Sequence, residues 1–266
     1  MLARPLRYSA IDPPGKPRAV VVVLHGFGAS GDDFRPIVPQ LDLPAALGVR
    51  FVFPDAPEMP VSLMGGQRAR AWFDFQLAPG ANLAALAAGA LGAVAGAAGP
   101  DGFGALVEGS ASFPGLDKAA LRVRDLLQSE IDDGVPAQRI VLAGFSQGGA
   151  LALHAGLLYP RPLAGVLALS TFLADRSKLG TPRTRANANT PILMCHGQRD
   201  AVLPMALGRR GHDQLQGAGY RVEWQDYAMG HEVCAPQLAA IGQWLRQVLA
   251  TREEKRKKKK EKKTKK

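Results

Sequence analysis

The sequence predicts an α/β protein whose mainly parallel sheet is covered by helices on both faces. Two observations support this fold class. Short apolar runs typical of buried strands alternate with helical stretches, and 266 residues suffice for one such domain of roughly 220 to 250 residues with a large core. The expected strands span residues 19–24, 50–53, 139–143, 164–169, 191–195 and 221–225.

Local patterns identify the individual elements. Residues 20–23 are consecutive valines, a β-branched run typical of a strand buried on both faces. Asp117 is expected to cap a helix, because apolar residues then recur on one helical face, at Ala120, Val123, Leu127 and Ile131. Pro236 opens a second stripe of this kind, at Leu238, Ile241, Leu245 and Val248, and we expect this last helix to pack on the sheet.

The most informative motif follows the strand that ends at Ala143. Residues 144–148 read Gly-Phe-Ser-Gln-Gly, and helix-prone residues come next. This order is the sequence form of a nucleophile elbow, a strained turn that exposes its serine hydroxyl. Glycine is needed because a β-carbon at position 144 or 148 would collide with the neighbouring strand or helix. The motif makes Ser146 the candidate nucleophile, and a plain turn with a solvated serine is the alternative.

A serine hydroxyl needs a base to remove its proton, and the base needs a carboxylate to fix its tautomer. Where the serine sits on such an elbow, the acid and then the histidine follow it along the chain. His231 lies on a loop after strand-like residues 221–224 and before the helix that Pro236 opens. Catalytic groups of open α/β sheets collect on such loops, so we expect His231 to be the base.

The other four histidines are expected to have other roles. His196 ends a strand and should be packed or hydrogen-bonded, whereas His212 lies in a polar helical stretch and should face solvent. His154 belongs to the helix behind the elbow. His25 should hold its loop in place rather than serve as a second base.

Asp200 is the expected acid. It lies on a loop between a strand and a helix, after the nucleophile and before the base, which is the required order. Asp213 falls on a helical face, and Asp226 lies within or at the end of a strand. Asp175 therefore remains the alternative acid.

An oxyanion hole needs one backbone N–H from the residue after the nucleophile and another from a loop after an early strand. The first residue is Gln147. The second is expected in the glycine-rich loop 25–31, where the backbone can approach a ligand closely. We assign the two donors to the N–H groups of Phe27 and Gln147.

Five separated blocks of the chain together resemble the phospholipase/carboxylesterase family, which includes the acyl-protein thioesterases. The resemblance covers about residues 18 to 250, and the blocks occur in the family's order: His25–Gly28, Trp72–Asp74, Gly144–Ala150, His196–Pro204 and Gly230–His231. It implies an α/β-hydrolase fold and an esterase or thioesterase of broad acyl specificity that uses no cofactor and no metal, with Ser146, Asp200 and His231 as its triad. It also implies that Trp72 and Phe73 line the acyl pocket, although such a pair is more often core.

The chain departs from the family pattern between Phe75 and Leu116. An insertion at about residues 79–115 includes an uncharged stretch, 82–96, that is rich in alanine and glycine and supplies little transfer energy for a membrane span. We expect either a mobile surface excursion or a lid that covers the acyl pocket.

The second departure is the tail, residues 251–266, which we expect to be a disordered appendage to a catalytic domain of residues 1–250. The tail holds eleven Lys or Arg and three Glu, a net charge of +8, so the rest of the chain carries only +2 of the total +10. Nine of those eleven are lysine, whereas arginine outnumbers lysine nineteen to three before residue 252. The tail could act in solubility, or in weak attraction to an anionic membrane or nucleic acid.

The remaining features constrain location and assembly. Cys195 and Cys234 have neither metal-ligand spacing nor a disulfide framework, so buried free thiols are expected. No apolar stretch of signal length follows the charged residues 1–7, which favours the cytoplasm. Monomer and homodimer both stay open.

Three function classes follow from these observations. The first is a serine hydrolase that cleaves ester or thioester bonds of small acyl substrates, lipids or lipidated proteins through an acyl-enzyme. The second is a serine peptidase or another hydrolase with the same triad, because fold and triad do not set the substrate. The third, a non-catalytic binding protein of the same fold, is disfavoured by an intact serine, acid and histidine in the required order.

Overall fold

A seven-stranded sheet forms the centre of the computed structural model, which describes residues 5–77 and 111–250. The strand order is β1-β3-β2-β8-β9-β10-β11, in which β1 pairs antiparallel with β3 and every other pair is parallel. The strands are β1 (Tyr8–Ile11), β2 (Ala19–Leu24), β3 (Val49–Pro54), β8 (Ile140–Phe145), β9 (Gly165–Leu169), β10 (Ile192–Gly197) and β11 (Val222–Tyr227). The α/β fold class and all six predicted strands are confirmed.

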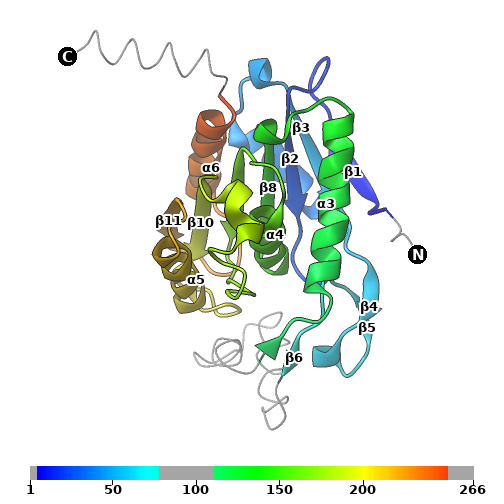
Figure 1. The fold of residues 1–266 in the computed structure, drawn as a ribbon, viewed down its shortest axis with the longest axis vertical. Coiled ribbons are helices and arrows are strands. Elements are labelled where there is room, and N and C mark those ends of the chain that lie inside the picture. The colour runs from blue at the N-terminus through cyan, green and yellow to red at the C-terminus, as the bar shows by residue number, and fades with distance from the viewer. Residues whose placement is uncertain (1–4, 78–110, 251–266) are drawn as a thin grey trace, which may run out of the picture.

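Helices cover both faces of this sheet (Figure 1). They are α3 (Leu116–Asp132), α4 (Gln147–Leu158), α5 (Met205–Gly217) and α6 (Ala235–Val248), together with the 3-10 helix η1 (Gly31–Leu41). Alternate residues of each strand point to opposite faces. Val20 and Val22 therefore join the core under α3, α4 and α5, whereas Val21 and Val23 join the core under η1 and α6.

Shorter elements lie outside the main sheet. Two small antiparallel pairs are β4 (Glu58–Pro60) with β5 (Arg68–Arg70) and β6 (Gln76–Leu77) with β7 (Ala111–Ser112). The short 3-10 turns are η2 (Ala45–Leu47), η3 (Ser62–Met64), η4 (Ala137–Arg139) and η5 (Pro182–Asn187).

The predicted cap of α3 is wrong, although its apolar stripe is confirmed. The helix begins after Gly115, which has a φ of +91° and makes no side-chain cap. Asp117 lies one residue inside the helix, and its Oδ1 is 2.8 Å from Nε2 of the buried His154 on α4. Asp117 therefore connects two helices instead of starting one.

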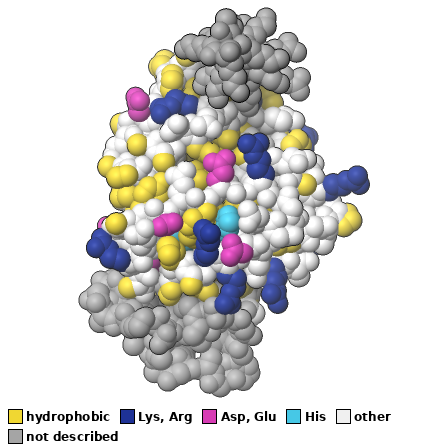
Figure 2. All heavy atoms as spheres, turned by 90° about the vertical axis from the view of Figure 1, so that its left-hand side faces the viewer, with side chains coloured by type: hydrophobic (Ala, Val, Ile, Leu, Met, Phe, Trp, Pro, Cys, Tyr) yellow, Lys and Arg dark blue, Asp and Glu magenta, His cyan; other side chains and the backbone are white. Residues whose placement is uncertain are grey.

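The two ends of the predicted insertion lie side by side, because β6 pairs with β7. Residues 78–110 and the tail 251–266 lie outside the described residues, so the lid, the excursion and the role of the tail are not tested. Figure 2 shows the face over α5, β11 and α6, where basic and acidic side chains are interspersed. This mixture agrees with the small net charge of the chain before its tail.

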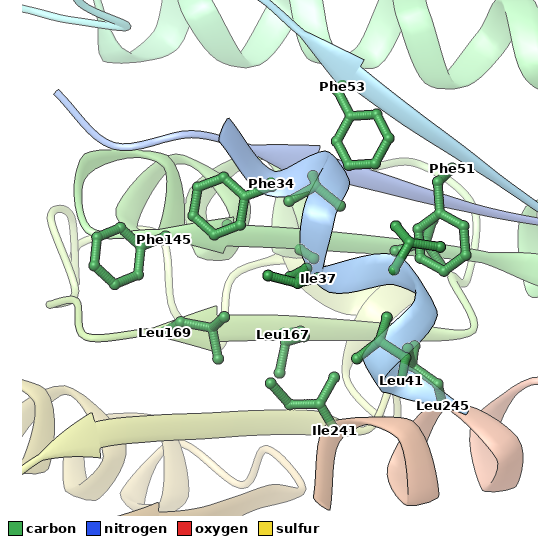
Figure 3. A pocket seen from close by; sticks show the side chains of 15 residues that line it. Phe34, Ile37, Leu41, Phe51, Phe53, Phe145, Leu167, Leu169, Ile241 and Leu245 are labelled. Atoms are coloured by element: carbon green, nitrogen blue, oxygen red, sulfur yellow. The ribbon is translucent and has the colours of Figure 1, made fainter. Parts of the chain in front are cut away.

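An apolar cavity of about 20 Å³ lies between η1, α6 and the sheet. Figure 3 shows Phe145 at one end of this cavity and Leu245 at the other. No polar side chain lines it, so we expect it to stay dry. None of the three predicted catalytic residues lines it, and it is too small for an acyl chain. It is a gap in the core packing rather than a substrate site.

The cysteines and the helices of the described residues bear on two further expectations. Both cysteines are free thiols, and the burial expected of them is confirmed for Cys195, whereas Cys234 is only partly buried. Burial raises the pKa of Cys195 to about 12. No helix within residues 5–77 and 111–250 combines the length and the hydropathy that a membrane crossing needs.

Replacing Gly242 with alanine should destabilise the fold by about 1–3 kcal/mol. Gly242 lies in α6, where an added β-carbon would come within 2.1 Å of the Leu41 carbonyl oxygen at the end of η1. The helix would have to move away from η1. Gly217→Ala in α5 is the control, because no described residue outside its own stretch of helix comes within 4 Å of its β-carbon position. Urea unfolding measures both, and wild-type stability in Gly242→Ala would show that this contact is loose.

Candidate active site

Ser146 occupies a strained turn between β8 and α4. Its φ is +54° and its ψ is −121°, a conformation that L-residues rarely adopt. Glycine is required on both sides of it. A β-carbon on Gly144 would lie 2.1 Å from the Gly148 carbonyl oxygen, and one on Gly148 would lie 2.3 Å from that of Leu24. The structure therefore has the elbow geometry that the motif predicts.

Two hydrogen bonds join this turn to the end of β9 and to the residues that follow it. The Ser146 N–H donates to the Leu169 carbonyl at 2.9 Å, and Thr171 Oγ1 donates to the Ser146 carbonyl at 2.7 Å. Within the described residues, Ser146 Oγ has no hydrogen-bond partner. The half-buried hydroxyl is thus available for reaction, and a contact with its base can tighten when substrate binds.

Asp200 and His231 form a direct hydrogen bond. Nδ1 of His231 lies 2.7 Å from Oδ2 of Asp200, whose side chain is fully buried. Oδ1 of Asp200 accepts the backbone N–H groups of Val202 and Leu203 at 2.9 and 2.8 Å. Burial alone would raise the pKa of the Asp200 carboxyl, but hydrogen bonds from His196 and His231 lower it to about 2. An ionised carboxylate only accepts, so Nδ1 of His231 carries a proton, and in the neutral tautomer of the ring Nε2 is the base.

Backbone hydrogen bonds connect the loop that carries Asp200 to the loop that carries His231. The N–H of Gln198 donates to the Tyr227 carbonyl at 2.8 Å, and that of Arg199 donates to Met229 at 3.0 Å. Only glycine fits at position 197, since a β-carbon there would lie 2.2 Å from the Gly230 carbonyl oxygen. The pairing of parallel strands β10 and β11 therefore continues into the loops and fixes the acid beside the base.

The ring of Phe145, next to the nucleophile, packs against the imidazole of His231. The two rings have centroids 4.7 Å apart, and Phe145 directly precedes Ser146. The imidazole is mostly buried, with 15% of its side-chain surface exposed. The structure thus brings Ser146, Asp200 and His231 to one edge of the sheet, beyond the carboxyl ends of β8, β10 and β11.

The glycine-rich loop after β2 lies against the nucleophile. A β-carbon on Gly26 would lie 3.4 Å from Cβ of Ser146. Within the described residues, the N–H groups of Phe27 and Gln147 donate no hydrogen bond. Both assigned oxyanion donors are therefore free to bind a substrate oxygen.

His25 has the structural role predicted for it. It is fully buried, its Nε2 accepts the Ala56 N–H at 3.0 Å, and its Nδ1 donates to the Gly26 carbonyl at 2.7 Å. Burial lowers the pKa of this imidazole. A neutral ring with both nitrogens bonded holds the loop and is not available as a second base.

Sequence reasoning assigned only the backbone of Gln147 and missed its side chain. The amide oxygen accepts the Trp72 N–H at 3.0 Å, and the amide nitrogen donates to the Phe73 carbonyl at 2.8 Å. The Trp72 indole donates to the His25 carbonyl at 2.8 Å. Trp72 and Phe73 belong to the buried core, 4% and 0% exposed, so their part in an acyl pocket stays a prediction.

The remaining candidates lie elsewhere. His196 is buried and hydrogen-bonded, as predicted. The prediction for His212 is wrong, because α5 packs this ring against Trp224 with centroids 5.8 Å apart and leaves it 6% exposed. Asp175 bonds to Ser177 and Lys178, not to His231. Within the described ranges, no cluster of three or more His, Cys, Asp or Glu could hold a metal ion.

Comparison with known proteins adds independent findings. The model of the phospholipase/carboxylesterase family matches residues 7–82 and 106–249, and the unmatched stretch falls inside the predicted insertion. Acyl-protein thioesterase 1 of Neurospora crassa is 35% identical, covering 87% of this chain and 87% of the relative. A probable carboxylesterase of Oryza sativa is 31% identical, covering 90% and 80%. The crystal structure of Zea mays acyl-protein thioesterase 2 superposes with a TM-score of 0.70 at 28% identity, covering 92% and 99%.

The low pKa of Asp200 should make the fold less stable in acid. The pKa of an aspartate is about 3.9 in an unfolded chain, whereas the pKa of Asp200 in the folded protein is about 2. Because folding favours its charged form, Asp200 contributes stability above about pH 4. That contribution, on the order of 2 kcal/mol, is lost as the pH falls towards 2. Urea unfolding at about pH 5 and pH 2.5 should show the difference between wild type and Asp200→Asn shrinking by that amount. A difference that does not change with pH would contradict the assignment.

Proposed function

Because the chain belongs to the phospholipase/carboxylesterase family, we propose that Ser146, His231 and Asp200 carry its reaction. The protein is a serine hydrolase that acts on ester or thioester bonds. The single observation that most supports the assignment is the 2.7 Å hydrogen bond between the buried Asp200 and His231. In the neutral imidazole this bond puts the proton on Nδ1, so that Nε2 can act as the base.

In the proposed mechanism, Nε2 of His231 takes the proton of Ser146 Oγ while that oxygen attacks the acyl carbonyl. The carbonyl oxygen becomes an oxyanion and accepts the N–H groups of Phe27 and Gln147. The tetrahedral intermediate collapses, the C–O or C–S bond breaks, and the leaving group takes the proton from His231. Water then attacks the acyl-enzyme with His231 as base, which releases the acid and restores the serine.

Acyl substrates are the class that the family and its relatives support. Several relatives are named acyl-protein thioesterases, and on this ground we propose lipidated proteins or lipids beside small acyl esters. We place the reaction in the cytoplasm and assign to the basic tail a weak contact with anionic membranes or nucleic acid. Trp72 and Phe73 are proposed to form the inner wall of the acyl site, because Gln147 ties their backbone to the elbow.

Ser146→Ala should lower turnover of p-nitrophenyl esters by about six orders of magnitude, as removal of the nucleophile does in other serine triads. Ser170→Ala is a matched control. Ser170 also has a positive φ, +44°, directly after the neighbouring strand β9, but its side chain is fully buried. The control should keep nearly full activity. A panel of esters from acetate to palmitate, an acyl thioester and a peptide reports substrate class, and activity in Ser146→Ala would remove the assigned nucleophile.

Asp200→Asn should lower turnover by up to about four orders of magnitude, because the amide no longer fixes the His231 tautomer. Asp175→Asn tests the alternative acid and should leave turnover near the wild-type value, since among the described residues the hydrogen bonds and the ion pair of Asp175 go to Ser177 and Lys178. Steady-state kinetics on one ester measure both variants. The opposite result, a fast Asp200→Asn and a slow Asp175→Asn, would reassign the acid.

A further inference from the structure

We propose that His196 is a positioning residue for the catalytic carboxylate, holding Asp200 and the loop behind it through its Nε2–H. The inference rests on the proposed function, in which Asp200 orients His231. His196 lies at the carboxyl end of β10, four residues before Asp200, and only 1% of it is exposed. Buried histidines with no task beyond packing need no charged neighbour, yet this one faces the acid of the triad.

The proton on His196 can be assigned from its partners. Nε2 lies 2.8 Å from the Leu203 carbonyl oxygen and 3.4 Å from Oδ2 of Asp200. Both groups only accept hydrogen bonds, so Nε2 must carry the proton. The N–H of His196 therefore donates to the carbonyl of Leu203, at the end of the acid loop. It also lies near the carboxylate of Asp200, at the start of that loop.

Both carboxylate oxygens of Asp200 face N–H groups. Oδ1 accepts two backbone N–H groups within its own loop, from Val202 and Leu203. Oδ2 faces two imidazoles, His231 from the loop after β11 and His196 from β10. His231 gains and loses a proton during each turnover, whereas His196 does not take part in proton transfer. In this proposal the fixed N–H of His196 keeps Oδ2 of Asp200 in place while the charge of His231 changes. The nearby N–H of His196 also lowers the pKa of Asp200.

The imidazole of His196 is itself locked in position. Trp224 of β11 stacks on it with centroids 6.0 Å apart and planes inclined by 18°. From α5, Gly208 leaves just enough room, since a β-carbon there would lie 2.4 Å from Nδ1 of His196. Trp224 is held in turn by Asp226, which accepts its indole N–H at 3.1 Å, and by the Arg209 guanidinium 5.3 Å above its ring. These contacts restrict the plane of the ring, and the bond from Nε2 to the Leu203 carbonyl directs Nε2 towards the loop that carries Asp200.

Four variants test this inference by steady-state kinetics and thermal unfolding. His196→Leu removes the N–H, and His196→Gln keeps an amide N–H at nearly the reach of Nε2. His196→Asn withdraws that amide by one methylene. His212→Leu is the matched control, because His212 also packs on Trp224 but has no contact with Asp200.

We expect His196→Leu to lower kcat roughly ten- to hundredfold, the effect of a small misplacement of a catalytic group, with KM changed less than about twofold. His196→Gln should recover most of the loss, and His212→Leu should keep the wild-type kcat even where its melting temperature falls. If the leucine variant does not fold, the comparison of His196→Gln with His196→Asn carries the test, with the glutamine variant expected to be faster.

A wild-type kcat in His196→Leu, or equal kcat values in the glutamine and asparagine variants, would overturn the inference. Ser146→Ala and Asp200→Asn measured in parallel separate the two proposals. If both are inactive while His196→Leu is fully active, only the role of His196 fails. If either keeps full activity, the proposed triad fails and the inference with it.

Discussion

The buried carboxylate of Asp200 is the constraint on which the rest of the site depends. A charged group without water is stable only when hydrogen-bond donors surround it. Here two backbone N–H groups and the His231 imidazole donate hydrogen bonds, and Nε2 of His196 lies 3.4 Å from the carboxylate. The hydrogen bond from His231 to this carboxylate fixes the proton of the neutral imidazole on Nδ1. In that tautomer Nε2 is unprotonated and can act as a base.

The catalytic loops can lie this close together because glycine lets their backbones approach one another. The elbow, the oxyanion loop and the acid loop each contain a glycine, at positions 148, 26 and 197, where a β-carbon would meet the atoms of another catalytic segment. Ser146 itself adopts a positive φ, and the energy of that conformation is offset by the packing of β8 and α4 around it. The strained Ser146 and these three close contacts all lie at the edge of the sheet where the chemistry is proposed to occur.

The sequence predicted those parts of the fold that depend on local pattern. Apolar runs located all six long strands, and the elbow motif located the turn that carries Ser146. Strand β1 was missed because it is a short antiparallel edge strand with an exposed Tyr8 and no apolar run. The cap at Asp117 and the solvated His212 were wrong for a common reason: each side chain has its partner in another element, at His154 and Trp224. Side-chain partners far apart in sequence, such as Gln147 with Trp72 and Phe73, leave no local pattern.

The central claim is that Ser146 reacts because Asp200 holds His231 in its basic form. Covalent labelling with a fluorophosphonate, followed by mass mapping of the digested protein, tests it most directly. The account predicts one adduct per chain, on the peptide that contains Ser146, formed orders of magnitude more slowly in Asp200→Asn. An adduct on another residue, or an equal labelling rate in Asp200→Asn, would contradict it.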